Sequence, residues 1–264
     1  MRRNRKIIYA VLVVLLLALA LSGFFVHKKV SHTIVDVSWP NCKSTPSTDF
    51  QEGVIGVTGG LDFKPNPCLA KESAWFGRYA LYMNTGYPGQ AYGKKYMNTP
   101  QQCESTDDVC LAYNYGFAAA TYGTRLAAQD GVYSDLWWLD VETDNSWTNN
   151  TQVNRAVLEG AVAAIRHNSL FAQVGIYSTP NEWATITGKW HNHLPAWLGT
   201  GLLTAQAAAK KCQAPTFTGG SLWVSQYTTK IDENVTCTEA FSQRLSSPAM
   251  MAGSLLTLFN QNHY

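Results

Sequence analysis

The chain has 264 residues, of which 46% are hydrophobic and 14% charged, and its formal net charge is +2. Six of the 20 Lys and Arg residues precede residue 31, so residues 31–264 carry 14 basic against 18 acidic side chains, a formal charge of −4. No cluster of Lys and Arg remains there that would follow a phosphate backbone, which argues against nucleic acid as a partner.

The chain begins with four basic residues and an uncharged run at residues 7–26. Twenty helical residues rising 1.5 Å each span about 30 Å, the thickness of the hydrocarbon core of a bilayer. The run exceeds the roughly 7–15 apolar residues of a cleaved signal. We expect residues 1–30 to form a cytoplasmic tail and a transmembrane signal anchor, with residues 31–264 as a monomeric extracellular domain. Small residues at 18–23 leave cleavage and secretion as the alternative.

All six cysteines lie beyond this segment, and an even number outside the membrane indicates disulfides. They are Cys42, Cys68, Cys103, Cys110, Cys212 and Cys237. Six cysteines allow fifteen connectivities, and pairing of nearest neighbours in the sequence, which would pin three loops, is our hypothesis. There is no C-x-x-C or H-E-x-x-H motif, and His191 and His193 lie in a loop without an evident third ligand, so we expect no metal and no cofactor.

In the first half of the domain, strands are expected at residues 33–38, 53–58 and 79–84, and a helix at 69–78. The strand at 33–38 places Asp36 near its end. Residues 90–108 are polar and irregular, and Cys103 and Cys110 lie nearby. We therefore expect a stapled insertion there.

In the second half, apolar residues of 153–165 recur at helical spacing, which predicts an amphipathic helix. The other expected elements are helices from Asp107 or Asp108 to Gln129, from Pro180 and at 202–211, and strands at 136–143, 174–178, 196–199, 222–227 and 231–235. Residues 238–264 give no clear pattern. Alternating strands and helices predict a single parallel (β/α)8 TIM-like barrel, irregular in its last strands, with its site at the carboxyl ends of the strands.

The strand at 136–143 is apolar on both faces and ends in two carboxylates, Asp140 and Glu142. Side chains alternate along a strand that rises about 3.3 Å per residue, so the two point the same way about 6.6 Å apart. Each ionised group makes ionisation of the other harder, which suits an acid/base pair. In a barrel, Asp36 would reach the same mouth. The alternatives are that the pair caps a helix or binds an Arg, and that Asp36 caps a turn.

Nine Trp and 13 Tyr accompany the 14% of charged residues, where about a quarter is usual. Aromatic faces suit stacking on sugar rings. The stacking candidates at expected strand ends are Trp39, Trp147 and Trp197, whereas Trp75, Trp137 and Trp223 are alternatively core residues. A G-x-S-x-G motif is absent and the cysteines are expected to be oxidised, which leaves no Ser or Cys nucleophile of those kinds. Carboxylates with aromatic side chains point to glycoside cleavage.

Four segments, taken in this order and at this spacing, carry a resemblance to a known family. They are IVDVS at 34–38, WLDVE at 138–142, GIYS at 175–178 and WVSQYT at 223–228. Together they resemble glycoside hydrolase family 25, the barrel lysozymes that cut peptidoglycan between N-acetylmuramic acid and N-acetylglucosamine. Further segments resemble a branch of cysteine-containing, secreted bacterial relatives whose activity is largely unassigned. These are WPNC at 39–42, NPC at 66–68, YMNT at 82–85, WW at 137–138 and FTGG at 217–220.

The resemblance implies roles for three acids. Glu142 would be the general acid, and Asp140 would stabilise positive charge on the sugar, directly or by orienting the 2-acetamido group of the substrate. Asp36 would line the site and hydrogen-bond the sugar or Asp140. The implied substrate contacts are Tyr177, Trp197, Gln226, Asn84, Trp39 and Asp232.

The sequence departs from the family at two places. Thr236 stands where members carry an Asp after Asn-Val, and Asp232 is the candidate to take its place. The third strand has YMN at 82–84 in place of the usual His-Phe. We expect a cell-surface glycosidase that acts on peptidoglycan or a related amino-sugar polymer. The alternative is a glycan-binding or scaffold barrel descended from such an enzyme.

Overall fold

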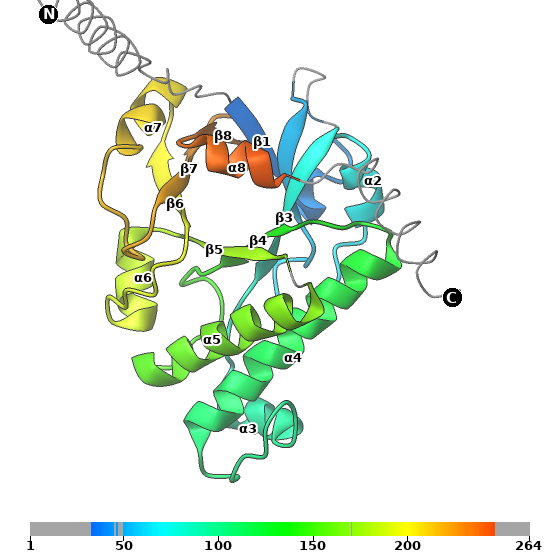
Figure 1. Ribbon diagram of the computed structural model, residues 1–264, viewed down its shortest axis with the longest axis vertical. Coiled ribbons are helices and arrows are strands. Elements are labelled where there is room, and N and C mark those ends of the chain that lie inside the picture. The colour runs from blue at the N-terminus through cyan, green and yellow to red at the C-terminus, as the bar shows by residue number, and fades with distance from the viewer. Residues whose placement is uncertain (1–32, 45, 47–49, 170, 246–264) are drawn as a thin grey trace, which may run out of the picture. The chain divides into compact units, whose positions relative to one another are not determined.

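Eight strands close into a barrel in the computed structural model, which describes residues 33–44, 46, 50–169 and 171–245 (Figure 1). The strands are β1 (Thr33–Val37), β2 (Glu52–Gly56), β3 (Arg78–Asn84), β4 (Leu136–Asp140), β5 (Gln173–Ser178), β6 (Ala196–Leu202), β7 (Leu222–Thr228) and β8 (Asp232–Thr236). Strands that are neighbours in the sequence are neighbours in the barrel. The predicted α/β barrel is confirmed.

The last strand differs from the expected parallel arrangement. Strands β1 to β7 pair in parallel, whereas β8 runs antiparallel to both β7 and β1. Only residues 229–231 connect β7 to β8, and a parallel crossover needs about a dozen residues or more. The expectation of parallel strands throughout is therefore wrong for β8. The expected irregularity of the last strands is confirmed, since β6 and β7 also pair with register shifts.

Each of the five helices from residue 108 onward begins after a residue whose side chain caps it. The helical segments are η1 (Trp39–Asn41), α2 (Leu69–Ser73), α3 (Gln90–Gly93), η2 (Lys94–Tyr96), α4 (Asp108–Gln129), α5 (Thr151–Asn168), α6 (Pro180–Thr187), α7 (Ala205–Lys211) and α8 (Glu239–Arg244). Asp107 caps α4 by accepting from the Cys110 amide at 3.0 Å. Two expectations are corrected: the helix expected at 69–78 ends at Ser73, and Leu202 belongs to β6 rather than to α7.

The three disulfides join nearest neighbours in the sequence, as hypothesised. They are Cys42–Cys68, Cys103–Cys110 and Cys212–Cys237. The third disulfide ties the end of α7 to the residue that follows β8. It therefore secures the antiparallel strand that closes the barrel.

Apolar side chains pack on both sides of the sheet. Inside the barrel, Ile34 and Trp138 are completely buried. The Trp138 ring lies edge-on to Trp197 and Trp223, with ring centroids 5.8 and 6.3 Å apart. Leu139, the next residue along β4, belongs to a second cluster that includes residues of α4 and α5. The interior of the barrel is thus a packed core below its mouth.

Among the described residues, no helix is long and apolar enough to cross a membrane. The segment expected to do so, residues 7–26, lies outside the described residues. The anchor and the domain boundary after residue 30 therefore stay predictions.

Helices α4 and α5 lie side by side along one side of the barrel (Figure 1) and approach closely at two glycines. A Cβ atom at Gly116 would lie 1.9 Å from the carbonyl oxygen of Val157, and one at Gly160 would lie 2.0 Å from that of Tyr113. Neither position has room for a side chain. Because α4 precedes β4 and α5 follows it, this contact supports the strand that ends in Asp140.

We predict that Gly116→Ala lowers the free energy of unfolding by about 1–3 kcal/mol, because the added methyl group forces two backbones apart. Denaturant unfolding followed by circular dichroism measures the change. Gly123→Ala is the matched control on α4, since its nearest neighbour would be the flexible end of Met83 at 3.2 Å. Equal stability of the two variants would contradict the close helix contact.

Candidate active site

A cavity of about 110 Å³ lies where the parallel strands end. It is lined by Asp36, Tyr82, Asp140, Glu142, Tyr177, Trp197, Gln226 and Asp232. Seven of these eight were predicted from the sequence. Asp232 is the first residue of β8, and it reaches the mouth because β8 runs opposite to the other strands.

Asp140 and Glu142 lie on one face at the end of β4, as the alternation requires. Strand β4 ends at Asp140, but the Val141 amide still donates to the Tyr177 carbonyl at 2.9 Å, so the extended pairing continues. Asp140 is 4% exposed and Glu142 is half-buried. Among the described residues neither pairs with an Arg, and Asn150 rather than either acid caps α5. The structural alternatives for the pair are therefore wrong.

The environment of the pair favours protonation. Burial, and then the charge of Glu142, raise the pKa of Asp140 well above its usual value, while Asn84 opposes this by donating to Oδ2 at 2.5 Å. Burial and the charge of Glu182 raise the pKa of Glu142. Asp140 Oδ1 is buried and has no hydrogen-bond partner among the described residues. Two negative charges on the pair are therefore unfavourable.

Amide side chains hold Asp36 in place across the cavity. Its Oδ2 atom accepts from Asn234 Nδ2 at 2.6 Å and from Gln226 Nε2 at 3.2 Å. Trp197 Nε1 donates to Asn234 Oδ1 at 2.7 Å, and the Tyr177 hydroxyl donates to Gln226 Oε1 at 2.7 Å. Each amide is thus oriented by an aromatic donor. The network fixes this wall of the cavity before any ligand enters.

Asp36 is a third group with a raised pKa. Burial and the charge of Asp232 raise its pKa to about 8, against the opposing hydrogen bonds from Asn234 and Gln226. Because its partners lie on distant strands, the turn-capping alternative for Asp36 is wrong. Although four acids line this cavity, no group of three His, Cys, Asp or Glu among the described residues is arranged to hold a metal ion.

Sequence reasoning missed Tyr82 and Asn234 and misplaced Asn84. Tyr82 lines the cavity from β3. Because side chains two residues apart in a strand share a face, the prediction of Asn84 as a site residue would also have indicated Tyr82. Asn234 follows Asp232 by two residues in β8, so the same rule applies. Asn84 is not a lining residue. Its amide holds Asp140 and is itself oriented by Thr58, whose hydroxyl donates to Asn84 Oδ1 at 2.9 Å.

Of the three tryptophans proposed for stacking, Trp197 lines the cavity. Trp39 lies on η1, is 46% exposed and is not a lining residue. Trp147 is half-buried, and its Nε1 donates to the carbonyl of Glu142 at 2.9 Å. The core alternative is confirmed for Trp137 and Trp223, which are buried.

A family model described as Lysozyme-like protein 1 matches residues 119–209 of this chain. The match covers about a third of the chain and includes Asp140, Glu142, Tyr177 and Trp197. No curated protein matches the chain.

Solved structures to which this chain is similar include the following three. One is GHIP, a glycosyl hydrolase 25 of Streptococcus pneumoniae, at 16% identity over 77% of this chain and 85% of that chain, with a TM-score of 0.47. A muramidase from Trichobolus zukalii has 12% identity over 77% and 92%, with a TM-score of 0.45. The Clostridium perfringens spore cortex lytic enzyme SleM has 13% identity over 78% and 67%, with a TM-score of 0.48. The similarity to lysozyme-like proteins that the motifs indicated is confirmed by the family model over residues 119–209.

Proposed function

We propose that the chain is a glycosidase that cleaves peptidoglycan or a related amino-sugar polymer. The observation that carries the proposal is the pair of Asp140 and Glu142, both with raised pKa, in one cavity at the mouth of the barrel. Glycoside cleavage needs an acid that protonates the leaving oxygen and a group that stabilises positive charge on the sugar. A pair with one protonated and one ionised member supplies both.

Glu142 is the proposed general acid because it is the more exposed member of the pair. In the reacting form Glu142 carries a proton and Asp140 is ionised. Glu142 gives its proton to the glycosidic oxygen, and the Asp140 anion lies beside the positive charge that develops on the sugar. The amide of Asn84, which donates to Asp140 Oδ2, stabilises that anion.

The cavity is sized for the reacting bond rather than for a whole sugar ring. Its volume of about 110 Å³ corresponds to about three or four water molecules at about 30 Å³ each. The sugar rings then lie across the mouth, where Tyr177, Trp197 and Gln226 contact their substituents. The pKa of Asp36 is about 8, so its carboxyl group is protonated at neutral pH. The hydroxyl of this group then donates a hydrogen bond to a sugar oxygen.

The second candidate function is a barrel that binds glycan without cutting it. The observation that favours it is the departure from the family's motifs at residues 82–84 and at Thr236. The two candidates differ in whether bound wall polymer is cleaved.

We expect Glu142→Gln to lower the release of reducing sugar from purified cell wall by about 10²–10⁴-fold, because a positioned general acid contributes about this much. Sedimentation of the variant with wall material is expected to be unchanged. Mass analysis of the fragments made by the unaltered protein names the bond that is cut. If the unaltered protein sediments with wall and releases no sugar, the binding barrel is the correct assignment.

Glu182 lies outside the cavity, and replacing it tests whether Glu142 is the general acid. The measured quantity is the pH dependence of kcat/KM. Glu182 accepts from the amide and hydroxyl of Thr143 at 3.1 and 3.0 Å, and its charge raises the pKa of Glu142. Glu182→Gln removes this charge and lowers the pKa of Glu142. Since the general acid must be protonated, kcat/KM then begins to fall at a lower pH on the alkaline side.

The matched control is Glu159→Gln, which removes the same charge from an exposed position on α5. Its pH profile is expected to match that of the unaltered protein. A profile of Glu182→Gln that coincides with that of Glu159→Gln would show that Glu142 is not the acid.

We also propose that the barrel works outside the cytoplasm, tethered by residues 7–26. The three disulfides support this, because disulfides persist in oxidising compartments. Protease added to intact cells is expected to digest the barrel and leave a short membrane-bound fragment. A barrel that stays intact until the cells are lysed would contradict the proposal, and barrel recovered from the medium would indicate cleavage.

A further inference from the structure

A second cavity, of about 440 Å³, lies at the same end of the barrel. Its walls come from the loops after β2, β3 and β4, from α3 and η2, and from α4. The lining residues that matter here are Asp62, Phe63, Tyr92, Tyr96, Tyr115 and Asn145. None of them was among the predicted site residues.

Two loops connect this cavity to the acid pair. The amide of Asn145 donates to the carbonyl of Glu142 at 3.2 Å, and a turn of this kind keeps the two Cα atoms within about 7 Å. Gly86, which also lines the cavity, follows Asn84 by two residues, and Asn84 donates to Asp140. The second cavity therefore lies beside the loop that follows Glu142.

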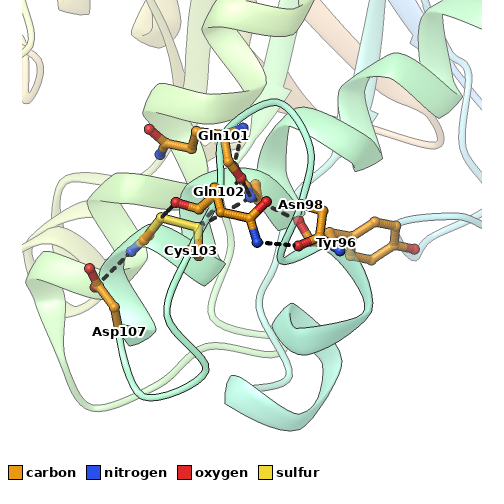
Figure 2. Close-up of a disulfide and its surroundings, with 8 residues drawn as sticks. Tyr96, Asn98, Gln101, Gln102, Cys103 and Asp107 are labelled. Atoms are coloured by element: carbon orange, nitrogen blue, oxygen red, sulfur yellow. Dashed lines mark hydrogen bonds between the residues drawn. A yellow bond between two sulfur atoms is a disulfide. The ribbon is translucent and has the colours of Figure 1, made fainter.

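The insertion before α4 forms one aromatic wall and is held in a fixed shape. The Cys103–Cys110 disulfide ties it to the first turn of α4 (Figure 2). The side-chain amide of Asn114 on α4 donates to the carbonyls of Tyr96 and Gln101 at 2.8 and 2.7 Å. The predicted stapled insertion is thus confirmed, and Tyr96 is placed by covalent and hydrogen-bonded contacts.

A carboxylate lies among aromatic rings in this cavity. Ring centroids are 5.5 Å apart for Phe63–Tyr96, 5.4 Å for Phe63–Tyr115 and 5.7 Å for Tyr96–Tyr115. The Tyr115 hydroxyl donates to Asp62 Oδ2 at 2.9 Å. Burial raises the pKa of Asp62 to about 6, so the group is ionised at neutral pH.

The charge of Asp62 is not neutralised by the described part of the chain. No Lys or Arg in that part forms an ion pair with it. Lys95 also lines the cavity, but its ammonium lies over the ring of Tyr92, 4.8 Å from the centroid. A half-buried carboxylate without a counter-ion is an unfavourable arrangement that a cationic ligand relieves.

The Nδ2 atom of Asn145 has no acceptor among the described residues, but it is buried and is therefore not presented to a ligand. The cavity thus offers a carboxylate and aromatic faces, a set that suits a cation better than it suits sugar hydroxyls.

We propose that this cavity binds a primary ammonium group on a peptide substituent of the glycan. Asp62 pairs with the ammonium, and the ring of Tyr96 contacts it through a cation–π interaction. The inference rests on the proposed function, because the sugars of peptidoglycan carry amine-bearing peptides. The cavity then selects which wall polymers reach the acid pair.

The test compares two soluble probes, a wall disaccharide that carries a peptide with a free amine and the same molecule with the amine acetylated. Affinity for the full chain is measured by calorimetry in the Glu142→Gln background, so that no probe is cut. We expect the free amine to bind about tenfold more tightly, as a charge-assisted hydrogen bond implies. Asp62→Asn is expected to remove this difference by weakening only the free-amine probe.

Two further variants guard against a folding artefact. Asp62→Glu keeps the charge and is expected to retain part of the difference, and Glu104→Gln, which removes a charge from an exposed position outside the cavity lining, is expected to retain all of it. Equal affinity of the two probes, or a difference that persists in Asp62→Asn, would overturn the proposal and favour a second sugar site. Activity of the unaltered protein on cell wall is scored separately, so wall cleavage without discrimination between the probes overturns this inference alone.

Discussion

The removal of carboxyl groups from water is the constraint on which the site depends. Asp36, Asp140 and Glu142 surround one cavity, and no described Lys or Arg pairs with them. Ionising all three would bring like charges together in a partly dry space. The protein meets this constraint with amide donors and with retained protons rather than with cations. A hollow of this kind is electrostatically prepared to give a proton and to stabilise a developing positive charge.

The direction of β8 completes this arrangement. In a parallel barrel each strand would present its last residues to the mouth, but β8 presents its first ones. Asp232 therefore lies where its charge raises the pKa of Asp36, and Asn234 lies where it donates to Asp36. The short connection after β7 and the disulfide at the end of β8 thus contribute directly to the electrostatics of the cavity.

Local rules allowed much of the site to be predicted. Alternation along one strand placed Asp140 and Glu142 together, and the alternation of helical and strand patterns indicated the barrel that delivers Asp36. The direction of β8 and the role of Asn234 are tertiary properties, since Asn234 bonds residues 37 and 198 positions away. Trp39 was misplaced because the chain turns into η1 directly after β1. The charge of Asp62 became informative only once its missing counter-ion was known.

The contact between α4 and α5 has a consequence for substrate choice. The first turns of α4 carry Tyr115 and the disulfide of the insertion, its far end leads into β4, and backbone-to-backbone packing at Gly116 and Gly160 joins it to α5. Residues that line the second cavity and the strand that ends in Asp140 are therefore attached to one tightly packed helix pair. If both proposed sites act on one polymer, this packing selects side branches by their length as well as by their charge.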